Sequence, residues 1–308
     1  MRIVFMGTPA AAAVSLQRLL NDGHEIAAVY TQPDRPSGRG NKLTYSPVKQ
    51  LAVDSGLTLL QPTKIKTPDA LEEFRAFAAD VAVVVAYGRI LPDGFLKGFP
   101  NGAINVHFSL LPKYRGAAPV NWAIVNGESK TGVTTMKMDA GLDTGDILLQ
   151  KETAIGDREN SISLMLRLGD IGADLLSETL STLSDIEPIP QDHSHATLAP
   201  IMKKEDGKFE WSFPAAKIAR MVRGFQPFPT TYTFFDGKKL TILDAAPTAE
   251  STDAAAGSVI TASGSEFVVA CGSETALSIT EIQLEGKKRM AARDFLNGVK
   301  LKPGDSLA

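Results

Sequence analysis

The apolar run Val81–Ala86 constrains the fold of this 308-residue chain more than any other segment. It consists of four valines and two alanines, and valine favours β-strands. A strand without alternating polar positions is typical of a parallel sheet whose two faces are covered by helices. The run therefore predicts an α/β fold with helices on both faces of a mostly parallel sheet.

Strand and helix signals alternate through the first half of the chain. Arg2–Met6 reads as a first strand. Ser46-Pro47 and Thr67-Pro68 each place a capping side chain before a proline, a combination that starts helices. Ile162–Leu183 has the apolar period of a helix. We predict a Rossmann-like domain over residues 1–184.

The composition changes after this helix. Residues 185–208 contain Pro188, Pro190 and Pro200, and we expect a linker there. Residues 209–308 read as strands and turns, with Asp236-Gly237 as a hairpin turn. A small OB-like β-barrel fits this pattern. The expected strands are Thr231–Phe235, Leu240–Leu243, Gly257–Ala262, Glu266–Cys271 and Leu277–Leu284.

Several function classes are excluded by composition. The single cysteine, Cys271, rules out an intramolecular disulfide and a cysteine-based metal cluster. His193 and His195 lack a third ligand, so we expect no metal. The chain opens on a strand and has no run long enough to span a membrane, and we expect a cytoplasmic protein. The net charge of −3 gives no overall signal for nucleic acid.

A dinucleotide site is the obvious alternative for a chain that begins with a strand. That site needs a G-x-G-x-x-G loop and an acidic residue at the end of the second strand. Here Gly7 is followed by Thr8-Pro9, and the second strand ends at Tyr30-Thr31. The dinucleotide fingerprint is therefore absent.

An amide and an imidazole stand two residues apart in the expected strand Ala103–His107. Residues two apart share a face of a strand, so Asn105 and His107 point the same way. An amide NH₂ beside a protonated imidazole provides two donors for an oxygen that gains negative charge. The competing interpretation is structural, with His107 buried in the core and Asn105 capping a turn.

A carboxylate follows in a glycine-rich turn. Asp143 within reach of His107 would hold the ring in its charged form and could relay a proton through water. The cluster needs no serine or cysteine nucleophile if the substrate brings its own amine. The three residues therefore indicate acyl transfer through a tetrahedral intermediate.

These residues resemble the catalytic signature of the folate-dependent formyltransferases, and within them the methionyl-tRNA formyltransferase family. Phe108 and Arg89 depart from the usual pattern beside the expected folate site. The matching segments are Asn105-x-His107, Ser109-Leu110-Leu111-Pro112 and Asp139-x-Gly141-x-Asp143. Three further features narrow the resemblance to the tRNA enzymes: the loop Thr31–Gly40, the run Arg115–Pro119 and a carboxy-terminal domain of this size.

The resemblance implies transfer of a formyl group from 10-formyltetrahydrofolate to methionine on initiator methionyl-tRNA, for translation initiation. Asn105 and His107 would stabilise the oxyanion, and Asp143 would support His107 and move the proton. It also implies a folate site at the carboxyl ends of the parallel strands. The folate-binding residues would be Arg89, Ile90, Leu91, Ser109, Leu110, Leu111, Pro112, Asp139 and Gly141.

The tRNA contacts implied are a basic loop and a second basic cluster. Arg35, Arg39 and Lys42 would clamp the acceptor end, with Arg39 the strongest candidate, while Lys287, Lys288 and Arg289 would contact the stem. A solvated basic turn is the alternative for the second cluster. We expect a monomer.

Three other functions remain open from the sequence. A formyltransferase for a small amine and a formyltetrahydrofolate hydrolase would share Asn105, His107 and Asp143. A catalytically silent RNA-binding module would not need these three residues. The basic loop and the appended domain favour a tRNA acceptor.

Overall fold

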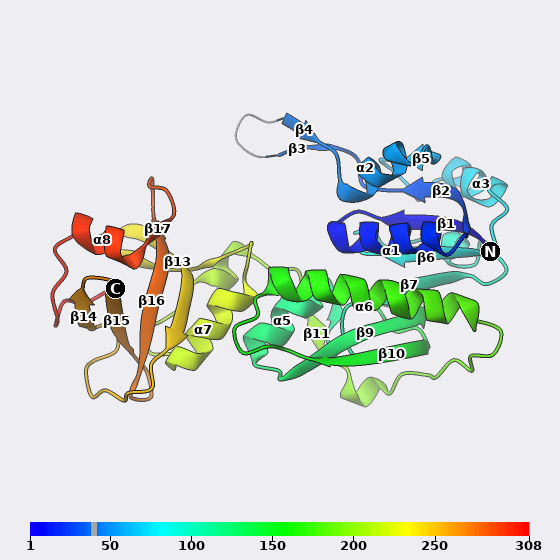
Figure 1. Ribbon diagram of the computed structural model, residues 1–308. Helices are drawn as coiled ribbons and strands as arrows, with labels where there is room; N and C mark the ends of the chain where they lie inside the picture. Colours follow the sequence, from blue (N-terminus) through cyan, green and yellow to red (C-terminus); the bar gives the residue numbers. More distant parts are fainter. Residues whose placement is uncertain (38–41, 308) are drawn as a thin grey trace. The chain divides into compact units, whose positions relative to one another are not determined.

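The computed structural model describes residues 1–37 and 42–307 (Figure 1). The chain forms two compact units, and each is built from separated segments. The first contains Met1–Pro119, Lys130–Ala154 and Ser163–Pro200; the second contains Val120–Ser129, Ile155–Ile162 and Ile201–Ala308. This division differs from the linear arrangement expected from the sequence, in which residues 1–184 were followed by a linker at 185–208.

A seven-stranded sheet forms the centre of the first unit. Its order is β10-β9-β7-β6-β1-β2-β5, and every pairing from β7 to β5 is parallel. The last two strands, β9 and β10, are antiparallel to their neighbours. The strands are β1 (Arg2–Gly7), β2 (Glu25–Tyr30), β5 (Leu59–Leu60), β6 (Val81–Val85), β7 (Ala103–His107), β9 (Lys130–Lys137) and β10 (Ile147–Ala154).

Helices cover this sheet on both faces, as the apolar run predicted (Figure 1). All five residues of β6 are buried. Phe74 of α3 and Phe95 of α4 pack in one core cluster with Val84, while Gly172 of α6 lies against Val106 on the other face. The helices are α1 (Ala10–Asn21), α2 (Pro47–Asp54), α3 (Pro68–Ala76), α4 (Asp93–Leu96) and α6 (Ser161–Ser181).

The helix starts follow from the capping residues. The side chain of Ser46 accepts a hydrogen bond from the Lys49 amide, and that of Thr67 accepts one from the Ala70 amide. Each satisfies a backbone donor that the first turn of a helix leaves without a partner. The mixed sheet and these helices confirm the predicted α/β class.

Two small strand pairs complete the first unit. Strands β3 (Arg35–Ser37) and β4 (Lys42–Thr44) form an antiparallel hairpin on either side of residues 38–41. Strand β8 (Arg115–Gly116) pairs with β11 (Leu198–Ala199), close in sequence to the short helix η1 (His193–His195). Residues 185–200 of the expected linker thereby belong to the first unit, and residues 201–208 belong to the second.

The second unit is built on an antiparallel sheet, ordered β12-β13-β16-β15-β14 with β17 beside β16. Asp236 and Gly237 have positive φ values of 48° and 71°, which suits the predicted hairpin turn. Among the described residues β12 does not pair with β14, so the barrel is not closed by hydrogen bonds. The elements are α5 (Pro119–Asn126), η2 (Lys204–Gly207), α7 (Ala215–Gly224), β12 (Thr231–Phe235), β13 (Lys238–Pro247), β14 (Val259–Ser263), β15 (Glu266–Cys271), β16 (Thr275–Leu284), β17 (Met290–Ala291) and α8 (Ala292–Gly298).

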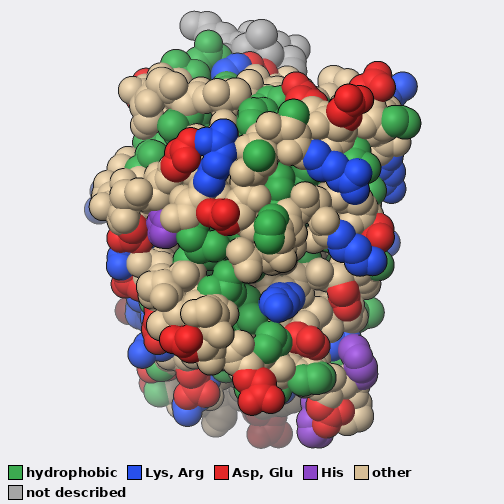
Figure 2. Space-filling view, turned by 90° about the vertical axis from the view of Figure 1, so that its right-hand side faces the viewer, with side chains coloured by type: hydrophobic (Ala, Val, Ile, Leu, Met, Phe, Trp, Pro, Cys, Tyr) green, Lys and Arg blue, Asp and Glu red, His purple; other side chains and the backbone are tan. Residues whose placement is uncertain are grey.

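The surface carries charges of both signs. On the face drawn in Figure 2, acidic and basic side chains are interspersed with hydrophobic and other groups. Within residues 1–37 and 42–307, no helix is long and apolar enough to cross a membrane.

Candidate active site

Strand β7 places two polar side chains at its carboxyl end. Asn105 and His107 are only 8% and 6% exposed, although both are polar. Val106 between them faces α6, so the two polar side chains lie on the opposite face. In the described part of the chain the Asn105 amide has no hydrogen-bond partner, which leaves its N–H groups available to a ligand.

The imidazole of His107 is fixed by a backbone carbonyl. Its Nε2 lies 2.9 Å from the carbonyl oxygen of Tyr114. Because a carbonyl oxygen can only accept, Nε2 must carry a hydrogen and donate it. The other nitrogen, Nδ1, lies 3.6 Å from Oδ2 of Asp143. A second proton on this ring would therefore sit on Nδ1 and face a carboxylate.

Asp143 comes from the loop between β9 and β10. Its side chain is 16% exposed, and its Oδ2 accepts a hydrogen bond of 2.7 Å from the Gly116 amide. The backbone of Asp143 has a φ of 50°, in the left-handed region that non-glycine residues rarely adopt. A specific backbone conformation thus directs this carboxylate toward His107.

The rest of the loop is held by its own residues. Oδ1 of Asp139 accepts hydrogen bonds from the Gly141 amide at 3.0 Å and from the Thr144 hydroxyl at 2.6 Å. A Cβ on Gly145 would lie 1.7 Å from the carbonyl oxygen of Lys137, so only glycine fits there. The expected folate residues Asp139 and Gly141 shape the turn that carries Asp143.

The run Ser109–Pro112 follows β7 and leads to Tyr114, whose carbonyl oxygen binds His107. The hydroxyl of Ser109 donates to the Lys113 carbonyl at 2.6 Å, and the backbone of Ser109 and Leu111 bonds to Thr134. Leu111 is buried, and Leu110 lies over Gly132 of β9. The structure thus engages the side chains of Ser109, Leu110 and Leu111 within the protein, in the turn that presents the Tyr114 carbonyl.

A hollow of about 570 Å³ lies beside the loop that follows β6. Arg89 and Ile90 line it, and the side chain of Ile90 is 74% exposed. Arg89 donates to the Thr63 carbonyl at 2.9 Å. Leu91, by contrast, is buried in the core. The hollow is lined by Gln32, Thr63, Lys64, Ile65, Lys66, Thr67, Gly88, Arg89 and Ile90.

The hairpin of β3 and β4 begins next to an ion pair. Asp34, just before β3, forms an ion pair of 2.5 Å with Lys49, and Gln61 donates to it at 3.0 Å. The hydrogen bond from Lys49, and then that from Gln61, lower the pKa of Asp34. Arg35 and Lys42 lie on β3 and β4, and Arg39 lies outside the described residues.

The second predicted basic cluster lies in the turn between β16 and β17. Lys287 and Lys288 are exposed, while Arg289 forms an ion pair with Glu281. This carboxylate raises the pKa of Arg289. Two of the three predicted basic side chains are therefore solvated, and the third is paired within the protein.

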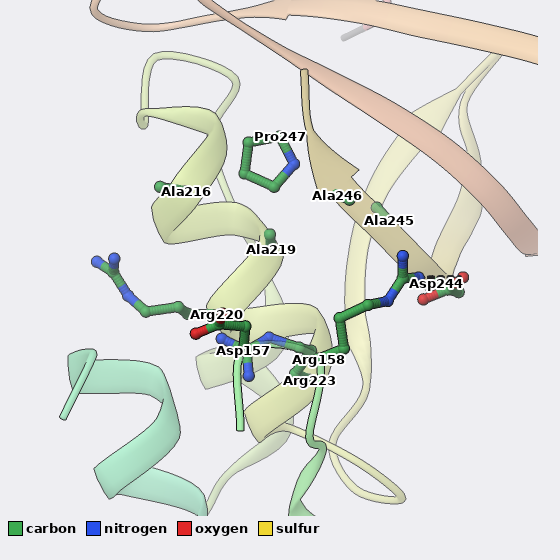
Figure 3. Close-up of a pocket in the computed structure, with 10 residues that line it drawn as sticks. All are labelled: Asp157, Arg158, Ala216, Ala219, Arg220, Arg223, Asp244, Ala245, Ala246 and Pro247. Atoms are coloured by element: carbon green, nitrogen blue, oxygen red, sulfur yellow. Dashed lines mark ion pairs between the residues drawn. The ribbon is translucent and has the colours of Figure 1, made fainter. Parts of the chain in front are cut away.

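A smaller hollow of about 230 Å³ lies in the second unit, between α7, β13 and residues 155–162 (Figure 3). Three arginines reach it, and each has a partner. Arg158 is 3.9 Å from Asp244, Arg220 donates to the Val125 carbonyl at 3.3 Å, and Arg223 donates to the Glu159 carbonyl at 2.7 Å. These contacts fasten the separated segments of the second unit together.

Family models match both parts of the chain. The model described as "Formyl transferase" matches residues 1–180, and "Formyl transferase, C-terminal domain" matches residues 201–300. The chain belongs to the formyl transferase family. The family predicted from the sequence is thus confirmed.

Relatives of the full length carry a more specific name. A methionyl-tRNA formyltransferase of Solibacter usitatus is 49% identical over 309 residues, covering 100% of this chain and 98% of that protein. One from Caldanaerobacter subterraneus is 48% identical over 310 residues and covers 100% of each. These matches show that the chain is a member of the methionyl-tRNA formyltransferase family.

The fold is also found in solved structures of formyltransferases. The crystal structure of WlaRD, a sugar 3N-formyl transferase in the presence of dTDP and 5-N-formyl-THF, superposes with a TM-score of 0.69. It covers 94% of this chain and 99% of that one at 18% identity. At this identity the likeness shows the shared fold alone.

Proposed function

We propose that this chain transfers the formyl group of 10-formyltetrahydrofolate to the α-amino group of methionine on initiator methionyl-tRNA. The convergence of Asn105, His107 and Asp143 in one small site carries this proposal. The full-length relatives named methionyl-tRNA formyltransferases support the choice of acceptor.

Asn105 and His107 stabilise the oxyanion that forms when the amine attacks the formyl carbon. The amide of Asn105 is buried at a fixed position and has N–H groups without a partner in the described part of the chain. Such preorganised donors act strongly where water is excluded. Because Nε2 of His107 is committed to the Tyr114 carbonyl, the Nδ1 edge, which faces Asp143, is the edge left for the substrate.

Asp143 faces Nδ1 of His107 and helps to move one proton. A bond forms between the amine nitrogen and the formyl carbon, the bond from that carbon to N10 of the folate breaks, and the proton of the amine ends on N10. The separation of 3.6 Å between Nδ1 and Oδ2 is too long for a direct hydrogen bond. The proton of the amine would instead reach N10 through a water molecule.

We propose the hollow after β6 as the folate site. It lies at the carboxyl end of a parallel strand next to β7, where ligands bind in open α/β sheets. The exposed Ile90 offers an apolar surface to a ring, and the exposed Lys64 and Lys66 suit the carboxylates of a glutamate tail. Arg89, Ile90 and the backbone of Leu91 remain our proposed contacts, whereas Ser109–Pro112 would act through the shape of the turn.

The tRNA contacts rest on charge. Arg35, Arg39 and Lys42 remain the proposed clamp on the acceptor end, because clustered basic residues can neutralise neighbouring phosphates. Lys287 and Lys288 are exposed and remain candidates for a second contact. The expectations of a monomer and of a cytoplasmic location stay predictions.

One assay tests the acceptor. The protein is incubated with 10-formyltetrahydrofolate and, in separate reactions, with methionyl initiator tRNA, with a nucleotide-linked amino sugar, or with water alone, and tetrahydrofolate release is followed. We expect fast release only with the tRNA. Release at the same rate without an acceptor would identify a hydrolase and contradict the proposal.

A further inference from the structure

The side-chain amide of Gln191 uses all of its hydrogen-bonding capacity and binds the backbone of the loop that carries Asp143. Its side chain is 6% exposed, although it lies in the proline-rich segment that the sequence marked as a linker. The Nε2 group donates to the carbonyl oxygens of Asp143 at 3.0 Å and Gly145 at 2.7 Å. The Oε1 atom accepts from Nε and Nη2 of Arg115, at 3.1 Å and 2.6 Å.

These bonds connect both sides of the contact that orients the carboxylate. The amide of Gly116, which donates to Oδ2 of Asp143, directly follows Arg115. Gln191 therefore holds the backbone of the acceptor residue and, through Arg115, the chain beside the donor. Arg115 is itself buried and also donates to Nδ1 of His193 at 3.1 Å.

The Asp143 backbone needs such an anchor. Its positive φ is unfavourable for a residue with a Cβ and persists only where surrounding contacts impose it. The two carbonyls that Gln191 binds lie on either side of Thr144, so the amide fixes the orientation of this part of the turn. Without it the carboxylate could rotate away from His107, and a displacement of about 1 Å can cost about a hundredfold in rate.

We propose that Gln191 is a positioning residue that sets the Asp143 carboxylate against His107. The inference rests on the proposed catalytic role of Asp143. It assigns a part in the reaction to a segment that the sequence did not associate with the site.

Gln191→Glu separates the two functions of this side chain. A glutamate has the same length and still accepts from Arg115, but it cannot donate to the carbonyls of Asp143 and Gly145. The matched control is Gln226→Glu in the second unit, because Nε2 of Gln226 also donates to two carbonyls, those of Val222 at 3.1 Å and Leu243 at 3.0 Å. Both variants lose the same kind of bond.

We expect Gln191→Glu to lower kcat about 10- to 100-fold, with KM for folate and tRNA changed by less than about threefold. Gln226→Glu should change kcat by less than about twofold, even if its melting temperature falls by as much as that of Gln191→Glu. Equal effects of the two variants on kcat would overturn the inference. If Gln191→Glu does not fold, kcat is measured in Gln191→Met, an apolar side chain of similar length that removes both sets of hydrogen bonds.

A double-mutant cycle shows whether Gln191 acts through Asp143. In an Asp143→Ala background, Gln191→Glu should lower kcat by no more than about twofold, because the group that it positions is gone. The same fractional loss in both backgrounds would overturn the inference. If Asp143→Ala alone retains near-normal turnover, the proposed role of Asp143 fails instead, so the two failures are distinguishable.

Discussion

Two clusters of polar side chains, one in each unit, differ in how much of their bonding capacity is already used. In the first unit the Asn105 amide has no partner among the described residues, and Nδ1 of His107 stands 3.6 Å from Asp143. In the second unit each arginine of the Figure 3 hollow has a partner, such as the Glu159 carbonyl for Arg223. A site for chemistry fixes its groups while leaving bonds unmade, whereas a structural cluster completes them.

A large loss of turnover is expected at Asp143. Asp143→Asn keeps an oxygen that can accept from Gly116, so the loop should hold its shape, but the negative charge beside His107 is lost. We expect kcat to fall by about a hundredfold or more, within the range typical of proton-transfer groups. Steady-state rates at saturating folate and tRNA measure this. A decrease in kcat of less than threefold would contradict the proposed difference between the cluster around His107 and the arginine cluster of the second unit.

Arg39 tests the proposed clamp on the acceptor end of the tRNA. For Arg39→Ala we expect KM for tRNA to rise about tenfold and the dependence of log KM on log salt to lose about one unit of slope, since one phosphate contact disappears. Lys97→Ala, which removes a surface charge of the first unit, is the control. An unchanged KM in both variants would remove the clamp from the proposal.

Arg223 tests whether the arginine cluster of the second unit has a structural role. Arg223→Met removes the donor to the Glu159 carbonyl, and the free energy of unfolding should fall by about 1–3 kcal/mol. We expect kcat to stay within about twofold. Urea denaturation and the formyl-transfer assay measure the two quantities. As the control, Arg158→Met at an exposed position should lower the free energy of unfolding by no more than about 1 kcal/mol.

A loss of kcat in Arg223→Met without a loss of stability would contradict a structural role for the arginine cluster. Burial and the neighbouring Arg220 lower the pKa of Arg223, although the guanidinium stays charged at neutral pH. The stabilising contact should therefore be present throughout the neutral pH range.

The smallest effect is expected at Cys271. Burial raises the pKa of this thiol to about 12, so almost no thiolate is present in the folded protein at pH 8. A thiol reagent at this pH should label the urea-unfolded chain quickly and the native protein hardly at all. Because the unfolded thiol ionises at lower pH than the folded one, stability should also fall as pH rises above about 8.5. Fast native labelling would place Cys271 outside the core.

Local signals predicted much of the fold. The capping residues Ser46 and Thr67 start helices where expected, and Val81–Val85 is a fully buried strand. These features depend on neighbouring residues, which the sequence shows directly. The pair Asn105 and His107 was predicted correctly to share a face, because strand periodicity decides it.

Contacts between distant segments were not predictable in this way. Nothing near His107 indicates that its partner is the carbonyl of Tyr114, because backbone groups carry no sequence signature. Gln191 lies 48 residues beyond Asp143 in a proline-rich segment, and only the folded chain joins them. The prediction of a linker there depended on composition, which does not reveal that β11 pairs with β8.

The central claim is that Asn105 and His107 stabilise the oxyanion of formyl transfer. The single-turnover rate constant with both substrates saturating measures this step most directly, in Asn105→Ala and His107→Ala, with the exposed Asn101→Ala as control. We predict a loss of about a hundred- to a thousandfold in each site variant and an unchanged rate in the control. Near-normal rate constants in Asn105→Ala and His107→Ala would contradict the account.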